Sequence, residues 1–365
     1  MGRAQAAMAR FAARQGAIGF RRQSTARELP LLPYPQLCYD MDAFARRLGD
    51  VCRVGDGGAG CFMITELPKN LCQLHEELLQ GSRQFFALPL AEKEKVDYHQ
   101  SREFRGYMRQ GTENTAGQVD WREQVEFGRE EPRRQASDHL YSRLRGPNQW
   151  PSQPSSLRPL VLSWLEEMEE LSRKLTRALS VSLGLSETSL DGYFQQPHVQ
   201  AKIVHYPPSN GGGLGVGAHA DSGFLTLLWQ DEAGGLEFLD AQGCWIPALP
   251  IPASMVCNLG EVVQLLTGGV YPATVHRVLR PGAAGRVSLP YFWNPSLDVE
   301  VRPLELGALP AQLLGRPKES ENKMLPSYGM NAFKSLARSH PEVFARHHPD
   351  LACLPDGEVV YKSSL

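Results

Sequence analysis

The sequence predicts an α+β protein whose core is mainly β structure flanked by helices. From Pro197 onward, short alternating apolar runs are separated by Gly and Pro, which is typical of an all-β region. The residues before Pro197 contain longer runs with the apolar spacing of amphipathic helices. Many short strands at such spacing predict a closed sandwich, a barrel or a jelly roll.

The composition fits one large globular domain or two modest ones. The chain has 365 residues, of which 42% are hydrophobic, and its 38 Lys and Arg nearly balance its 40 Asp and Glu. The net charge of -2 gives no reason to expect nucleic acid or a membrane surface as a partner. We therefore expect a small-molecule substrate, whereas the sequence leaves the oligomeric state open.

The cysteines and the hydropathy pattern indicate an intracellular protein. There are seven cysteines, an odd number, and no C-x-x-C pair, which argues against a disulfide framework and a zinc ribbon. No apolar run approaches the ~20 residues that cross a bilayer. We expect a soluble protein that is cytoplasmic by default.

The first 27 residues have a composition of their own. They contain six Arg and eight Ala but no acidic residue. This composition is typical of an organellar transit peptide, and a disordered basic tail has the same features. The first interpretation would place the protein in a mitochondrion or a plastid.

Start and stop signals locate the elements that precede Pro197. Asp40 is a plausible helix N-cap, and Gly184 can end a helix. In chain order, we expect an extended segment at 31–37, a helix at 39–54, a strand at 61–64, a helix at 68–86 and a helix at 155–184.

After Pro197 the alternation predicts about seven strands. They cover residues 199–208, 224–230, 235–240, 244–249, 254–260, 274–279 and 286–293. Turn residues predict two hairpins, around residues 241–243 and around residues 281–285.

Polar side chains interrupt this apolar region in a chemically meaningful pattern. His219 and Asp221 are two residues apart, so on a strand both would project from one face and could bind one ion. His276 offers a second imidazole on another predicted strand. Two His and one carboxylate on one face of a metal leave the opposite positions free, which is the arrangement used by non-haem Fe(II) oxygenases.

A second pair of residues could bind an anion beside such a metal. Arg286 and Ser288 also share one face of a predicted strand, and an Arg fork with a hydroxyl suits a carboxylate. Tyr206 could add a phenolic donor. His205 precedes Tyr206, so alternation turns its side chain to the opposite face.

These motifs together resemble the plant-type 2-oxoglutarate and Fe(II)-dependent dioxygenases, a family that includes flavonoid and gibberellin oxidases and is related to isopenicillin N synthase. The resemblance covers roughly residues 30–300. Its further motifs are "YPP" at 206–208, "NLGE" at 258–261, "FWNP" at 292–295 and the N-terminal "FRGY" and "DWRE". Two residues depart from the family pattern, Val204 where Asn is frequent and Glu261 where Asp is usual, and we expect the second to affect only a structural turn.

The resemblance implies a double-stranded β-helix (jelly roll, cupin-like) flanked by helices. It implies that the iron ligands are His219, Asp221 and His276, and that the residues binding the distal carboxylate of 2-oxoglutarate are Arg286, Ser288 and Tyr206. The expected division of the chain is a basic N-terminal segment at 1–27, an N-terminal α/β region at 28–153, a scaffold helix at 154–196, the jelly-roll core at 197–300 and a C-terminal helical extension at 301–365.

The implied activity is an oxidation of a small organic molecule, with a role in secondary metabolism. Fe(II) would be the metal, 2-oxoglutarate and O2 the cosubstrates, and ascorbate a candidate reductant, with succinate and CO2 released. Hydroxylation is the default outcome, and desaturation and ring closure are alternatives. Two other readings stay open: a non-haem iron oxidase of the same superfamily that does not use 2-oxoglutarate, and a non-catalytic metal-binding jelly-roll module.

Substrate contacts are expected partly in the polar, aromatic stretch from residue 88 to residue 153, which also fits a satellite core under a long loop. The candidate substrate residues are Tyr107, Trp121, Arg122 and Phe292. This mixture of flat apolar surface and positive charge predicts a substrate with an aromatic or cyclic body and a carboxylate. The C-terminal extension is expected to be helical in part and to close over the barrel or meet a partner.

Overall fold

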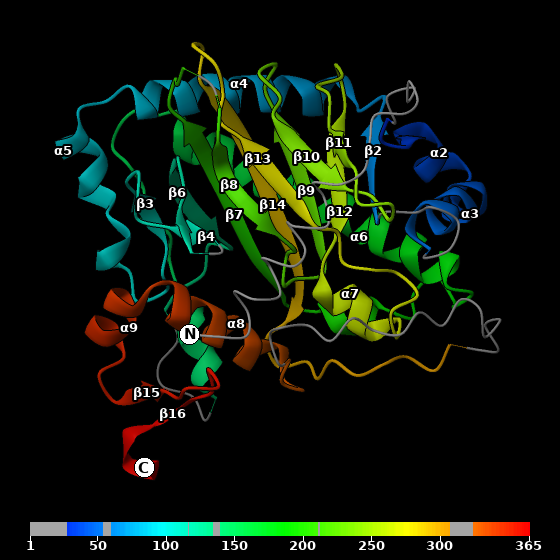
Figure 1. Ribbon diagram of the computed structural model, residues 1–365. Helices are drawn as coiled ribbons and strands as arrows, with labels where there is room; N and C mark the ends of the chain where they lie inside the picture. Colours follow the sequence, from blue (N-terminus) through cyan, green and yellow to red (C-terminus); the bar gives the residue numbers. More distant parts are fainter. Residues whose placement is uncertain (1–27, 54–59, 116, 134–138, 211, 307–323) are drawn as a thin grey trace, which may run out of the picture.

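The protein is built around two facing β-sheets (Figure 1). The computed structural model describes residues 28–53, 60–115, 117–133, 139–210, 212–306 and 324–365. The eight-stranded sheet has the order β1 (Leu31–Pro33), β2 (Cys61–Thr65), β12 (Met255–Leu259), β9 (Leu225–Gln230), β14 (Arg286–Ser296), β7 (Pro197–Tyr206), β6 (Glu123–Gly128) and β3 (Gly106–Met108). The four-stranded sheet has the order β11 (Trp245–Pro247), β10 (Leu236–Leu239), β13 (His276–Leu279) and β8 (Leu214–His219). This is the expected double-stranded β-helix within an α+β protein.

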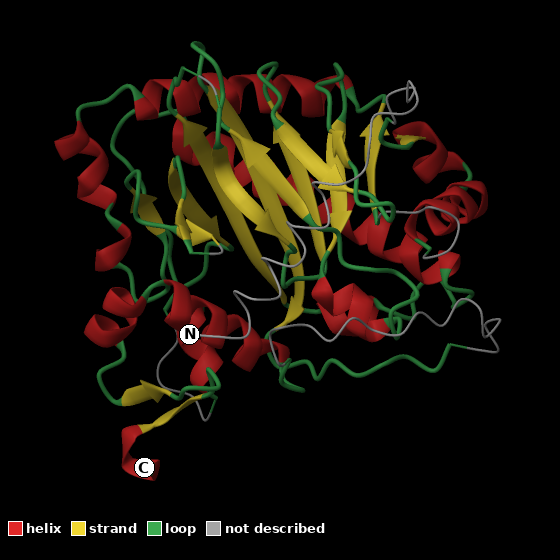
Figure 2. Ribbon diagram, in the orientation of Figure 1, coloured by secondary structure: helices red, strands yellow, loops and turns green. Residues whose placement is uncertain are grey.

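Helices cover the outer face of the larger sheet and close the ends of the molecule (Figure 2). They are α2 (Tyr34–Tyr39), α3 (Met41–Cys52), α4 (Lys69–Phe86), α5 (Leu90–Lys93), α6 (Leu157–Ser182), α7 (Glu261–Leu266), α8 (Tyr328–Ser339) and α9 (Pro341–His347). Two small hairpins are formed by β4 (Asn114–Thr115) with β5 (Gln118–Val119), and by β15 (Leu351–Cys353) with β16 (Val359–Tyr361).

The alternation of the strands produces two separate apolar cores. One lies between the eight-stranded sheet and its helices and includes Phe44, Trp164 and Trp293, all of them fully buried. The other lies between the two sheets and includes Val216 and Phe238. The site described below lies in this inner layer between the two sheets. Successive side chains of a strand point to opposite faces, so every second side chain of each strand points into the layer.

Start and stop signals in the sequence located the early helices well. Asp40 caps α3 by accepting a hydrogen bond from the Ala43 amide at 3.0 Å. α6 ends before Gly184, whose φ of +77° is a conformation that glycine adopts without a Cβ clash. Residues 34–37 depart from the expected extended segment, because Pro35 stands in the first turn of the short helix α2.

The stretch from residue 88 to residue 153 is more regular than a pocket-lining loop. β6 pairs with β7 and β3 pairs with β6, so this stretch extends the larger sheet by two strands. Three of the six residues of β6 are Glu or Gln, which obscured its alternation in the sequence.

One expected hairpin is confirmed and the other is wrong. β10 and β11 pair antiparallel across residues 240–244. β13 and β14 flank residues 280–285 but do not pair with each other: β13 pairs with β8 and β10, and β14 pairs with β7 and β9. The turn therefore carries the chain from one sheet to the other. The residues of the turn do not by themselves determine which strands pair.

The C-terminal residues are partly helical, as expected. α8 and α9 lie below β4 in Figure 1, and the β15–β16 hairpin follows them. Within the described residues, no helix is long and apolar enough to cross a membrane. The expected transit segment or tail at 1–27 lies outside the described residues.

Candidate active site

Two histidines meet because β8 and β13 are neighbours. His219 is the last residue of β8 and stands directly opposite His276, the first residue of β13. Their ring centroids are 4.3 Å apart. One ligand atom from each of these rings and one carboxylate oxygen of Asp221 all lie within 4.8 Å of one another.

Asp221 reaches this cluster by a different route from the one the sequence predicts. β8 ends at His219, so Asp221 lies in the turn before β9 and not on the strand with His219. Its carbonyl accepts a hydrogen bond from the Glu261 amide at 2.8 Å, which ties this turn to the start of α7. The turn, and not strand alternation, brings the carboxylate to the two imidazoles.

Hydrogen bonds orient both rings toward a common point. Nδ1 of His219 lies 2.8 Å from the Gly217 carbonyl, and Nδ1 of His276 lies 3.1 Å from the Thr274 carbonyl. Each carbonyl makes Nδ1 the protonated nitrogen, which leaves the Nε2 lone pair free to bind a metal. Both Nε2 atoms lie 3.8 Å from Oδ1 of Asp221.

The electrostatics of the cluster also fit a cation. Burial, followed by the charge of His276, lowers the pKa of His219 to about 4, which favours the neutral imidazole that a metal requires. Burial alone raises the pKa of Asp221, but the two histidines and two hydrogen bonds lower it overall. Those hydrogen bonds come from Thr226 at 2.6 Å and Asn258 at 2.8 Å, and both end on Oδ2, so Oδ1 remains available.

A buried guanidinium lies on the same inner layer. Arg286 is only 2% exposed, and it donates to the Ser288 hydroxyl at 2.9 Å and to Oε1 of Gln230 at 3.3 Å. Among the described residues, no carboxylate forms an ion pair with Arg286, and its buried Nε has no hydrogen-bond partner. A buried charge without a counter-charge is costly, so this arrangement fits an anionic ligand.

Tyr206 joins this group, whereas His205 does not. Tyr206 stands opposite Arg286 across β7 and β14, and the guanidinium lies over its ring at 4.9 Å from the centroid. His205 turns to the helix-covered face, where it stacks on Phe86 and lies 2.8 Å from Oε1 of Glu123. Strand alternation separates these two neighbours as predicted.

The four candidate substrate residues are not brought together. Phe292 is on the same face of β14 as Arg286, opposite Thr226, so it faces the cluster. Tyr107 is buried on the helix-covered side, where its hydroxyl donates to Glu123 at 2.6 Å. Trp121 lies under Arg280, whose guanidinium is 4.6 Å from the ring centroid, and donates to the Pro207 carbonyl. Tyr107 therefore belongs to the core, and Trp121 packs between Arg280 and the Pro207 carbonyl.

Arg122 lies next to β7 and β8, because Glu123 pairs with His205 on β7 and the Trp121 amide donates to the Gly215 carbonyl on β8. Its charge lowers the pKa of His219 and, in turn, the neighbouring Tyr206 helps to raise the pKa of Arg122. Burial alone would lower the pKa of Arg122, but Glu113 is the largest of the charges that outweigh it. Arg122 contacts Glu113 and lies 2.9 Å from Oδ2 of Asp120, so its guanidinium is fixed in position.

A cavity of about 430 Å³ adjoins Arg122 and the turn that carries Asp221. It is lined by Thr112, Glu113, Thr115, Arg122, Ser222, Glu261, Met324, Asn331, Lys334, Ser335, Arg338 and Ser339. Sequence analysis missed most of these residues. The one available signal was Glu261, a departure from the family pattern whose side chain lines the cavity. Nothing in the sequence indicated that residues of α8 would line this cavity.

Comparison with known proteins identifies the family. Residues 30–153 match the family described as non-haem dioxygenase in morphine synthesis N-terminal, and residues 197–295 match the 2OG-Fe(II) oxygenase superfamily. A homoarginine-6-hydroxylase of Arabidopsis thaliana is 36% identical over 236 residues, covering 64% of this chain and 66% of that protein. A 2-oxoglutarate-dependent dioxygenase of Gibberella zeae is 30% identical and covers 88% of this chain and 92% of that protein.

A solved structure agrees with these sequence matches. A 2OG-Fe(II) oxygenase family protein from Caulobacter crescentus superposes with a TM-score of 0.69 and 26% identity, covering 85% of this chain and 99% of that chain. Because both sequence regions and the fold match, the chain belongs to the 2OG-Fe(II) oxygenase superfamily and is a dioxygenase that uses Fe(II), 2-oxoglutarate and O2.

Proposed function

We propose that His219, Asp221 and His276 hold the catalytic Fe(II), and that the protein hydroxylates a small organic molecule. The donor set, two imidazoles and one carboxylate on one side of the cluster, is the facial arrangement that leaves positions for other ligands. A structural zinc site would use four protein ligands. The described residues offer three here.

The cosubstrate site is proposed at Arg286, Ser288 and Tyr206. The observation that carries this assignment is the buried Arg286 guanidinium, which has no carboxylate partner among the described residues and lies on the same inner layer as the metal cluster. A bidentate fork with a neighbouring hydroxyl recognises a carboxylate by geometry as well as charge. The distal carboxylate of 2-oxoglutarate supplies the missing counter-charge.

With its metal and cosubstrate bound, the site supplies an oxidation in which O2 converts 2-oxoglutarate to succinate and CO2 and places one oxygen atom in the substrate. The chain positions the reactants for this chemistry. Thr226 and Asn258 hold Asp221 so that Oδ1 faces the cluster, and backbone carbonyls orient both imidazoles. The buried residues Arg286, Ser288 and Tyr206 fix the cosubstrate, and their burial keeps water from Arg286.

Relatives support hydroxylation as the outcome and a small molecule as the substrate. The Arabidopsis relative is named as a homoarginine-6-hydroxylase, and a structure at 26% identity is JOX2 in complex with 2OG, Fe and JA. We propose in addition that residues 197–300 carry the chemistry, that 28–153 and 301–365 shape the substrate chamber, and that 154–196 serve as scaffold.

The decisive experiment is an anaerobic titration of the purified protein with Fe(II) and then 2-oxoglutarate. A weak visible charge-transfer band that needs both components is the expected result, because it arises when the keto acid chelates the metal. Fe(II) with succinate is the control. Absence of the band with iron still bound would favour an oxidase that does not use 2-oxoglutarate. If the same sample also consumes no O2 when air is then admitted, a non-catalytic metal-binding module would be favoured.

A further inference from the structure

Gln230, the last residue of β9, contacts the buried guanidinium of Arg286 through its side chain. It stands opposite Ser288 in the sheet, on the face that Arg286 and Ser288 share. Its Oε1 accepts a hydrogen bond from Nη2 of Arg286 at 3.3 Å. Its Nε2 donates to the Ala248 carbonyl at 2.7 Å. The second hydrogen bond fixes the amide so that its oxygen, and not its nitrogen, faces the guanidinium.

The next residue, Asp231, fixes the strand that carries Arg286. The Asp231 amide donates to the Val287 carbonyl at 3.1 Å, and the Val287 amide donates to Oδ2 of Asp231 at 2.7 Å. Asp231 is buried, and its Oδ2 also lies 3.2 Å from a guanidinium nitrogen of Arg83 on α4. Val287 stands between Arg286 and Ser288 in the chain, so Asp231 holds the backbone from which both of these side chains project.

A glutamine at position 230 orients the guanidinium and leaves its charge uncompensated. No carboxylate of the described residues forms an ion pair with Arg286, whose Nε is buried without a hydrogen-bond partner. A glutamate has the same length and would accept the same hydrogen bond, but it would add a counter-charge in a buried site. Such a carboxylate would compete with any anionic ligand of Arg286. The neutral amide therefore keeps the guanidinium available to an external carboxylate.

We propose that Gln230 sets the affinity of the Arg286 site for the cosubstrate carboxylate, by orienting the guanidinium without neutralising it, while Asp231 holds the strand in register. Gln230 is a positioning residue, because it acts through Arg286. This inference rests on the proposed function, since it takes Arg286 as the partner of the distal carboxylate of 2-oxoglutarate. It adds the requirement that the residue at position 230 accepts a hydrogen bond and carries no charge.

The test is an anaerobic titration of the Fe(II)-loaded protein with 2-oxoglutarate, followed by the charge-transfer band. Gln230→Glu should weaken 2-oxoglutarate binding by about tenfold or more, because the introduced carboxylate pairs with the guanidinium. Gln230→Met keeps the site neutral and removes only the hydrogen bonds, so it should weaken binding by less than about tenfold. The affinity for Fe(II) should be that of wild type in both variants, whereas a general loss of structure would change it.

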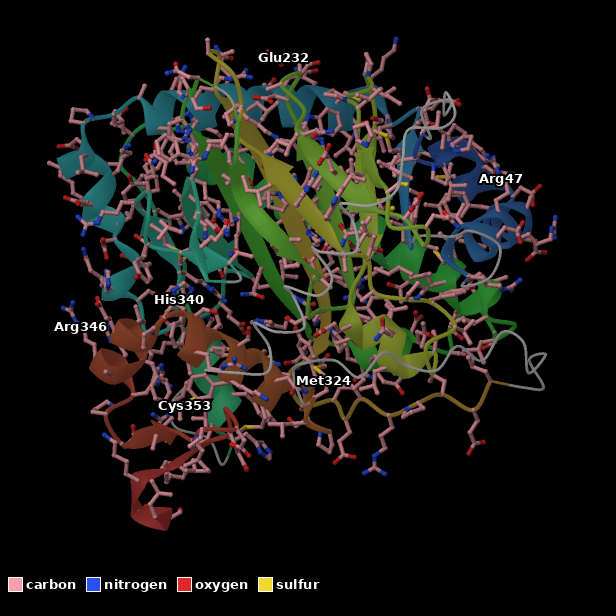
Figure 3. All side chains as sticks on the ribbon, viewed as in Figure 1. Arg47, Glu232, Met324, His340, Arg346 and Cys353 are labelled. Atoms are coloured by element: carbon pink, nitrogen blue, oxygen red, sulfur yellow. The ribbon has the colours of Figure 1, made fainter. Side chains whose placement is uncertain are left out.

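A second glutamine that contacts an arginine provides the matched control. Oε1 of Gln36 on α2 accepts a hydrogen bond from Nη1 of Arg47 at 2.9 Å, so Gln36→Glu adds the same charge beside another guanidinium. Arg47 lies on α3 at the edge of the molecule in Figure 3, whereas β9 lies near the centre of the same view in Figure 1. This variant should bind 2-oxoglutarate as wild type does.

Equal affinity for 2-oxoglutarate in Gln230→Glu and wild type would overturn the inference, as would weaker binding in Gln230→Met than in Gln230→Glu. If Gln230→Glu fails to bind Fe(II), the neutral variant decides, because unaltered 2-oxoglutarate binding in Gln230→Met would show that Gln230 does not orient Arg286. Failure of the proposed function itself is distinguishable, since wild type would then show no charge-transfer band with Fe(II) and 2-oxoglutarate.

Discussion

The guanidinium of Arg286 lies face-on over the ring of Tyr206, 4.9 Å from its centroid, and the two residues are directly opposite each other on β14 and β7. The contact fixes Arg286 without using a carboxylate. Ser288 and Gln230 hold two of its nitrogens from the same sheet. The proposed anion site is therefore assembled by strand register before any cosubstrate binds.

Replacing Arg286 by Lys should raise the KM for 2-oxoglutarate by about tenfold or more, because a point charge cannot reproduce the bidentate fork or the stacking on Tyr206. The KM for the primary substrate should change far less. Steady-state kinetics with each substrate varied in turn makes the comparison. Arg277→Lys, on the neighbouring strand β13 and paired with Glu237, is the control. A primary-substrate KM that rises instead would remove Arg286 from the cosubstrate site.

His219→Ala or Asp221→Ala should abolish turnover while the circular dichroism spectrum stays that of wild type, because a three-residue metal site without one ligand binds iron poorly. His205→Ala is the matched control, since His205 faces the helix-covered side of the sheet. Iron content and succinate release are measured for all three variants. Normal iron content and activity in His219→Ala would refute the metal assignment.

Thr226→Val should weaken Fe(II) binding about 10–100-fold, because it removes the 2.6 Å hydrogen bond that orients Asp221 and leaves the side-chain shape almost unchanged. Anaerobic Fe(II) titration measures the effect. Thr65→Val is the control and should bind iron normally. Thr65 is the last residue of β2 and lies at the opposite end of that strand from the residue that pairs with Asn258. Equal affinities in the two variants would show that Asp221 needs no support from Thr226.

Arg122→Ala should uncouple 2-oxoglutarate decarboxylation from substrate oxidation, because Arg122 lines the cavity beside the turn that carries Asp221. Tyr107→Phe should leave coupling intact and lower the free energy of unfolding by about 1–3 kcal/mol, since it removes a buried hydrogen bond to Glu123. Succinate and oxidised product are measured together, and stability by urea unfolding. The assignment of Arg122 to the chamber fails if its variant yields both products equally.

Glu113 should make stability fall at acid pH. Burial raises its pKa, but the charges of Arg122 and Lys202 outweigh burial and lower it from 4.5 to about 2. A lowered pKa in the folded state stabilises the fold above pH 4.5, and this contribution disappears as the pH falls toward about 2. Glu113→Gln should therefore be less stable than wild type at neutral pH, and the difference should shrink below pH 4.5 in urea unfolding measured across that range. A difference independent of pH would show that the charge of Glu113 is not responsible.

Local sequence patterns were sufficient for the elements and motifs whose signals lie close together in the chain. Helical spacing and an N-cap located α3, α4 and α6, and alternation located β7, β9, β12 and β14. Alternation also placed Tyr206 and His205 on opposite faces, because side-chain direction in a strand depends only on parity. The residue types of the motifs around His219, His276 and Arg286 indicated the chemistry, since few other functions need a His, an Asp and a second His with an Arg and a Ser nearby.

Only the tertiary structure decided how distant segments combine. The turn after β13 crosses between sheets instead of closing a hairpin, because strand pairing depends on long-range packing and not on the turn residues. The same packing sends Tyr107 into the core and brings residues of α7 and α8 to the cavity that Arg122 lines. These contacts join residues that are far apart in the chain, so neither periodicity nor spacing could predict them.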